Sequence, residues 1–142
     1  MTDAGKPLPD VDDPLTAPFW AATCESRLVL PRCTSCGYVC WPPEPVCPEC
    51  WHAEREWLEF PAQGCLWSFA VYHRALDPAF AADVPYAVGL VELDAGPKMY
   101  GITVGDPAQL QIGLRVRGVF HAVDENVTFL QWRIDDSADV GY

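Results

Sequence analysis

Positive charge is scarce in this sequence of 142 residues. Nine Lys and Arg residues stand against 20 Asp and Glu residues, which gives a formal net charge of −11. A protein that follows a nucleic-acid backbone needs a basic face to neutralise the phosphates, and this chain has few residues from which to build one. The composition therefore argues against nucleic-acid binding.

The sequence also lacks a long apolar run. Half of its residues are apolar, but no window approaches the roughly 20 apolar residues that cross a bilayer. The first 23 residues are acidic and rich in proline, without the basic start and apolar stretch of a signal peptide. We therefore expect no membrane association and a cytoplasmic location. Thiols stay reduced there, and an odd number of cysteines, seven, also argues against a closed disulfide framework.

Common catalytic motifs are missing as well. The sequence contains no nucleotide-binding glycine loop, no HExxH or GxSxG motif and no paired-carboxylate pattern. His52 and His121 are isolated, and we expect each to be solvated or hydrogen-bonded within the core. Nothing in the sequence therefore identifies a catalytic residue.

What the sequence does contain is a pair of CxxC motifs, separated by ten residues. They supply Cys33 and Cys36, then Cys47 and Cys50. Two such turns bring four thiolates together in a tetrahedron, which is the usual form of a closed structural zinc site. A tetrahedral sulfur site also suits iron, as in a rubredoxin-like electron carrier. Zinc is favoured because no redox partner motif accompanies the cysteines.

Three further cysteines lie outside this pattern. Cys24, Cys40 and Cys65 are predicted to be small buried hydrophobic side chains. Cys40 stands between the two CxxC motifs, but its spacing fits neither pair.

From about residue 56 to 134 the sequence is typical of β-structure, because stretches rich in aromatic and β-branched residues alternate with turn residues. The predicted strands cover residues 64–76, 86–94, 98–104, 115–123 and 127–134. Asp106 and Pro107 predict one short helical turn between the third and fourth strands. Five strands with a helix in that place are the order of an OB-fold barrel.

The chain is therefore predicted to be mainly β, with a short N-terminal helix, a rubredoxin-like zinc ribbon and a five-stranded OB-fold barrel. The predicted division is a disordered acidic tail over 1–13, the helix over 14–27, the ribbon over 28–55, the barrel over 56–134 and an acidic tail over 135–142.

Two clusters are candidates for contacts with a ligand or a partner. Tyr72, His73 and Arg74 form a dense polar cluster inside a predicted strand, where Tyr72 and Arg74 would share one face and His73 the other. The cluster would contact an anionic ligand or a partner, or would simply mark a strand that leaves the barrel. Phe19 and Trp20 on the predicted helix would either pack in the core or dock a partner.

Several motifs occur in order along the chain. They are PFW near the N-terminus, then RLVLPRCTSCGYVCWPPEPVCPEC, GCLWSFAVYHR, PYAVGLVELDAGPKMYG and IGLRVRGVF. In this combination the sequence resembles, over about residues 15 to 134, the zinc-ribbon and OB-fold proteins of the family called domain of unknown function 35. It departs from the family pattern at Trp51, where members often carry Gly, and near Gly101 and Ile102, where they often carry Asn or a similar polar residue.

The resemblance implies a non-catalytic subunit that pairs with a thiolase-fold enzyme as a hetero-oligomer, expected to be a heterotetramer. The partner would carry the catalytic residues for thiolytic or retro-aldol cleavage of an acyl-CoA, possibly at a steroid side chain. Zn²⁺ would be structural, and the CoA thioester would be a ligand shared by the complex. The contact candidates are Phe19, Trp20, Tyr72, His73, Arg74 and, from the second strand motif, Tyr86.

Two other functions stay open at this point. Zinc ribbons and OB-folds also bind single-stranded nucleic acids, but residues 56–134 hold nine acidic residues against five basic ones. Iron in the cysteine site would instead make the chain an electron carrier.

Overall fold

A single short helix precedes the β-structure. The structure is a computed structural model that describes residues 3–136. In it α1 (Ala17–Thr23) covers the middle of the predicted range 14–27. Pro18 lies in the first turn of α1, where its missing N–H costs no helical hydrogen bond. Within the described residues no helix is long and apolar enough to cross a membrane.

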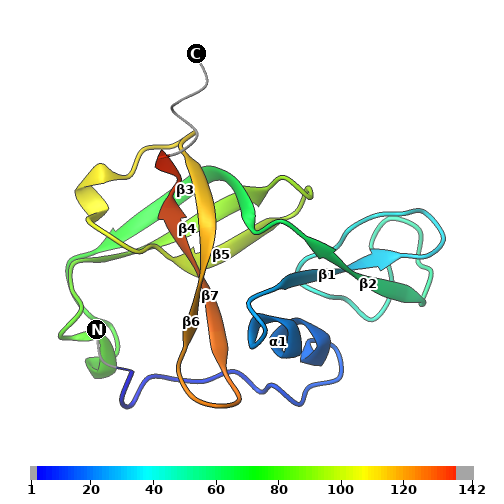
Figure 1. Cartoon of the computed structure of the whole chain (residues 1–142), viewed down its shortest axis with the longest axis horizontal. Coiled ribbons are helices and arrows are strands. Elements are labelled where there is room, and N and C mark those ends of the chain that lie inside the picture. Colours follow the sequence, from blue (N-terminus) through cyan, green and yellow to red (C-terminus); the bar gives the residue numbers. More distant parts are fainter. Residues whose placement is uncertain (1–2, 137–142) are drawn as a thin grey trace.

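The cysteine segment is bounded by a two-stranded sheet. β1 (Leu28–Cys33) pairs antiparallel with β2 (Arg55–Phe60), and the pairing runs from Leu28 opposite Phe60 to Cys33 opposite Arg55. The two cysteine turns lie in the connection between these strands, at the far end of the hairpin from the barrel (Figure 1). Because β2 pairs with β1, the sheet of the ribbon extends to residue 60, into the stretch that the sequence assigned to the barrel.

The remaining five strands form the barrel. They are β3 (Gln63–Tyr72), β4 (Tyr86–Leu93), β5 (Lys98–Ile102), β6 (Arg115–Ala122) and β7 (Thr128–Ile134). Their order in the sheet is β5-β4-β3-β6-β7, and all neighbours are antiparallel. A parallel bridge between Thr103 and Trp132, with a 2.7 Å hydrogen bond from Val104 N–H to Trp132 O, brings the two outer strands together. The sheet is therefore nearly closed.

Two short 3₁₀ helices connect the barrel strands. η1 (Pro78–Phe80) lies between β3 and β4, and η2 (Pro107–Gln109) lies between β5 and β6. Each begins with Asp-Pro, and the Asp carboxylate accepts a hydrogen bond from the backbone N–H two residues later. The predicted helical turn between the third and fourth barrel strands is confirmed in η2.

The third strand of the chain ends earlier than the sequence predicts. β3 stops at Tyr72, which lies opposite Tyr86, the first residue of β4. The pairing of β3 with β4 ends at that pair, and residues 73–76 are not in a strand. The prediction that His73 and Arg74 alternate within a strand is therefore wrong.

One core joins the helix, the ribbon and the barrel. Phe19 of α1 and Leu28 and Leu30 of β1 pack in the same cluster as the barrel residues, at whose centre Trp132 is fully buried. Gly101 makes room for this indole, because a Cβ at position 101 would lie 2.7 Å from Cδ1 and Nε1 of Trp132. The ribbon is therefore anchored to the barrel by shared packing as well as by the chain.

The N-terminal segment also contacts the barrel. The Lys6 ammonium lies 2.5 Å from the Asp83 carboxylate, with both side chains nearly buried, and 4.9 Å from the centre of the Phe80 ring. The Asp3 carboxylate lies 3.0 Å from Nε2 of His121. Composition alone indicated only an acidic tail here. Of the predicted C-terminal tail, residues 137–142 lie outside the described residues.

Substitution of Gly101 tests the packing of the barrel. We expect Gly101→Ala to lower the free energy of unfolding by about 1–3 kcal/mol, because the buried indole of Trp132 has no space into which to move. Denaturant unfolding of the metal-loaded protein measures this. Gly89→Ala is the matched control: its Cβ would meet the Leu66 and Thr103 methyl groups at 3.0 and 3.2 Å, so its loss should be smaller. If both variants lose the same free energy of unfolding, the Gly101–Trp132 contact does not contribute more than the packing around Gly89.

Candidate metal centre and adjoining groove

The two cysteine turns have the same backbone design. In the first, the N–H of Gly37 donates to the carbonyl of Cys33 at 3.0 Å, and in the second the N–H of Trp51 donates to the carbonyl of Cys47 at 2.8 Å. Gly37 and Trp51 both have positive φ, 80° and 69°. Each turn thus closes on the residue that follows its second cysteine, and this design aims both sulfurs of each motif at the same point.

The four sulfur atoms converge as the spacing predicts. The Sγ atoms of Cys33, Cys36, Cys47 and Cys50 all lie within 4.8 Å of one another. Across the two motifs, Cys33 and Cys50 are 3.5 Å apart, and Cys36 and Cys47 are 3.6 Å apart. A tetrahedron with Zn–S bonds of about 2.3 Å has sulfur–sulfur edges of about 3.8 Å. The donor set therefore fits one tetrahedral metal ion, and these four residues would hold it.

Metal binding is linked to the proton equilibria of the cluster. The backbone N–H of Cys36, with further hydrogen bonds, lowers the pKa of Cys33 to about 6. The backbone N–H of Tyr38 lowers the pKa of Cys36, but burial and the three neighbouring thiols together raise it to about 12. Four thiolates this close repel one another unless a cation neutralises them. A bound divalent ion supplies that charge, and its binding displaces the protons.

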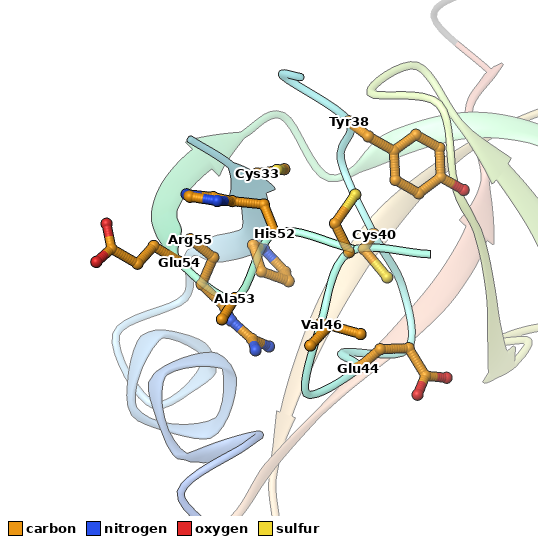
Figure 2. Close-up of a pocket in the computed structure, with 11 residues that line it drawn as sticks. Cys33, Tyr38, Cys40, Glu44, Val46, His52, Ala53, Glu54 and Arg55 are labelled. Atoms are coloured by element: carbon orange, nitrogen blue, oxygen red, sulfur yellow. The ribbon is translucent and has the colours of Figure 1, made fainter. Parts of the chain in front are cut away.

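The hollow that lies between Cys33 and Cys47 is too small for a substrate. Its volume is about 20 Å³, room for about one water molecule. Figure 2 shows its lining, in which Cys33, Cys40 and His52 face the hollow while the carboxylate of Glu44 points away. The Arg55 guanidinium donates to the carbonyl of Pro45 at 2.8 Å and so holds the loop between the two motifs. The centre is therefore suited to a structural role.

A much larger groove lies where the helix and ribbon meet the barrel. We call this the barrel groove; its volume is about 550 Å³ and its walls are mostly apolar. Its lining comes from the N-terminal segment, α1, the ribbon loop, η1 and four barrel strands. The residues are Asp3, Lys6, Pro7, Phe19, Trp20, Trp41, Pro42, Phe80, Val88, residues 98–102, His121 and residues 129–131. A groove of this size and character suits a drug-sized apolar ligand.

The basic side chains of the barrel groove already face acidic groups. The pairs are Lys6 with Asp83, Lys98 with Glu92, and His121 with Asp3, at 2.5, 3.8 and 3.0 Å. Such pairing leaves little net positive charge at the rim. The groove is thus better suited to an apolar or uncharged group than to a chain of phosphates.

The predicted contact residues fall into two places. Phe19 is buried, with its ring centre 4.4 Å from that of Trp41, while Trp20 is half-buried, and both line the barrel groove. Tyr72 and Tyr86 stack on one another, with ring centres 5.0 Å apart, where β3 ends and β4 begins.

His73 and Arg74 are exposed and lie outside the barrel groove lining. Conversely, sequence reasoning missed Lys98, Tyr100 and Gln131, which do line the groove. The alternation of side chains along β5 and β7 indicates which residues share a face of the sheet. It does not indicate that these residues lie in the same groove as Trp20.

The other cysteines and histidines are partly as expected. Cys24 is exposed, so its predicted burial is wrong, and Cys40 and Cys65 are only half-buried. Cys24 follows α1 directly, where the chain turns away from the core. His52 is exposed and contacts the Thr34 hydroxyl at 3.1 Å, and His121 is half-buried beside Asp3.

Comparison with known proteins also divides the chain into a zinc ribbon and an OB-fold barrel. A family model described as the ChsH2 rubredoxin-like zinc ribbon domain matches residues 20–54, and one described as the ChsH2 C-terminal OB-fold domain matches residues 57–121. The predicted fold class, a zinc ribbon followed by an OB-fold barrel, is confirmed.

Relatives include a "DUF35 domain-containing scaffold protein" of Methanocaldococcus jannaschii, 31% identical over 101 residues, which are 70% of this chain and 71% of that protein. A "probable enoyl-CoA hydratase alpha subunit" of Thermomonospora curvata is 37% identical over 100 residues, 69% of this chain but 31% of that protein. The chain thus spans about a third of the length of that hydratase subunit.

Solved structures include a chain of the "Ltp2-ChsH2(DUF35) aldolase", with a TM-score of 0.80, 31% identity, and coverage of 89% of this chain and 98% of that one. A protein of unknown function from Sulfolobus solfataricus, 14% identical with a TM-score of 0.62 and 87% coverage of each chain, shares the fold.

Replacing a single metal ligand tests the metal centre. We expect Cys47→Ser to lose its metal and leave the ribbon loops disordered, since a structural zinc site contributes on the order of 10 kcal/mol in small domains. Metal analysis by mass spectrometry, together with limited proteolysis, measures both effects. Cys40→Ser, also between the β-strands of the ribbon, is the control and should keep one ion per chain. Normal solubility and full zinc content in Cys47→Ser would contradict the assignment of Cys47 as a ligand. If the wild-type protein is red and contains stoichiometric iron, the metal is iron and not zinc.

Proposed function

Because the chain belongs to the DUF35 family of zinc-ribbon and OB-fold proteins, we propose that it is a non-catalytic subunit of a thiolase-fold acyl-CoA enzyme. The similarity to a chain of the Ltp2-ChsH2(DUF35) aldolase, over nearly the full length of both, is the observation that carries this proposal. The reaction of the complex would be cleavage of a carbon–carbon bond in an acyl-CoA, by a thiolase-like aldolase or a thiolase, with a steroid side chain as one candidate substrate.

The first task of the subunit is to brace its partner. Four cysteine sulfurs converge in the ribbon, and α1 and β1 share their packing with the barrel. A body held in this way can bind another protein without a large loss of conformational entropy. We infer a stable hetero-oligomer, for which two copies of each chain is the simplest arrangement, in the cytoplasm.

The second task is to shape the path of the acyl-CoA. The barrel groove is apolar, has a suitable volume and lies partly on β4 and β5, the strands that correspond to the ligand-binding face of OB-folds. Its basic side chains are already paired with acids. The groove therefore suits the acyl and pantetheine parts of the thioester, and the phosphates would lie on the partner.

Co-expression with a thiolase-fold enzyme encoded beside this chain tests the partnership. We expect one species in size-exclusion chromatography that contains both proteins, and we expect the enzyme alone to be inactive. Mutation of Cys47 in the same experiment should abolish the joint species, because the ribbon no longer folds. Separate elution, together with full activity of the enzyme alone, would contradict the proposed function.

Filling the barrel groove tests the acyl-CoA path. Ile102 lines the groove and Ile112 is exposed outside it, so Ile102→Trp and Ile112→Trp make a matched pair. In the complex we expect Ile102→Trp to raise KM for a bulky acyl-CoA by roughly tenfold, since the new ring occupies the path, with little effect on acetyl-CoA. Ile112→Trp should change neither value. Equal KM values for both variants and both substrates would remove the groove from the path.

A further inference from the structure

The second cysteine turn carries a tryptophan where its backbone favours glycine. Trp51 occupies the position of Gly37 in the first turn: each follows the second cysteine of its motif, and each N–H closes its turn on the first cysteine. Both adopt positive φ, where a Cβ is unfavourable and a bulky side chain is a rare exception. Glycine at position 51 would relieve this strain and still close the turn.

The indole of Trp51 gives the fold nothing visible in return. Its exposed fraction is 79%, and within residues 3–136 its ring makes no aromatic contact. The metal ligands and the turn hydrogen bonds need only its backbone. A large apolar side chain that is both conformationally costly and exposed indicates a role outside the chain.

Other exposed apolar groups surround Trp51 on the ribbon. Tyr38 is 40% exposed, and with Trp51 it lines a shallow groove of about 430 Å³ that also includes the exposed Pro45 and Pro48. We call Tyr38, Pro45, Pro48 and Trp51 the knuckle patch. Tyrosine, tryptophan and proline lose little conformational freedom when they are covered, and Tyr and Trp are frequent binding hot spots.

The rim of the knuckle patch is negative. Glu44 lines the groove and Glu49 stands between Pro48 and Cys50, both exposed. The nearby basic side chain of Arg55 is turned to the carbonyl of Pro45. Four thiolates around one divalent ion would add two further negative charges. A second copy of this chain would bring like charges together at such a face, so a basic surface is the better match.

We propose that the knuckle patch is the anchor by which this chain binds its partner enzyme. Trp51 enters an apolar pocket on the enzyme, and Arg or Lys side chains around that pocket face Glu44 and Glu49. The inference rests on the proposed function and names the contact surface for it. The barrel groove adjoins the shallow groove of the patch at Trp41 and Pro42, which line both, but none of the four residues of the knuckle patch lines the barrel groove.

Substitution of Trp51 by glycine separates docking from folding. We expect Trp51→Gly to keep its zinc and to be at least as stable as the wild type, while its Kd for the enzyme rises about thirtyfold or more. Isothermal titration calorimetry with the zinc-loaded full chain measures this. Trp51→Phe should recover most of the affinity. Ile112→Ala, which removes another exposed apolar side chain, should bind like the wild type.

Reversal of the rim charges tests the partner's chemistry. Glu44→Lys combined with Glu49→Lys should slow association at low salt, and the difference from the wild type should shrink as salt is added. If the wild type binds the enzyme and Trp51→Gly binds equally well, the knuckle patch is not the anchor, although the proposed function stands. If Trp51→Gly instead abolishes a dimer of this chain, the patch joins two copies and the inference is overturned. Failure of the wild type to bind any thiolase-fold enzyme would remove the proposed function itself.

Discussion

The ribbon depends on the convergence of four cysteine sulfurs, which lie within 4.8 Å of one another. Between β1 and β2 the chain forms no strand, and only one of its residues from 34 to 54, Pro43, is buried. Such a segment cannot bury enough apolar surface to offset the entropy of ordering its backbone. Metal–thiolate bonds offset that cost without a core. All the exposed loops of the ribbon, including the knuckle patch, thus take their shape from the same small centre.

That constraint reaches the barrel because β1 belongs to both units. Cys33 ends this strand at the sulfur cluster, while Leu28 and Leu30 lie in the common core with Phe19. A shift of the ribbon would therefore disturb buried residues and cost several kilocalories per mole rather than bend a free linker. This coupling gives the ribbon a fixed surface, which the proposed role as a bracing subunit requires. It also fixes the wall of the barrel groove, since Trp20 and Trp41 come from the helix and ribbon side.

Local patterns carried most of what could be predicted. The CxxC spacing is a property of two short turns, and stretches rich in aromatic and β-branched residues, bounded by turn residues, placed the five barrel strands nearly where they are found. Features set by distant residues were not predictable. β3 stops at Tyr72 because its partner β4 begins at Tyr86, and the nearly buried pair of Lys6 with Asp83 joins residues 77 positions apart. The barrel groove draws on segments that are spread from residue 3 to residue 131, so no window of the sequence contains it.

The two cysteine turns show how one backbone can serve two purposes. Both need a residue with positive φ after the second cysteine, and Gly37 meets that need at no steric cost. Trp51 meets it at a steric cost and leaves its indole in water, and only the proposed docking role gives this side chain a use. The metal centre makes this possible, because bonds between sulfur and a divalent ion are strong enough to hold a turn against local strain. The stability that the metal centre gives to the ribbon can therefore offset the strain at Trp51, whose indole is exposed to solvent.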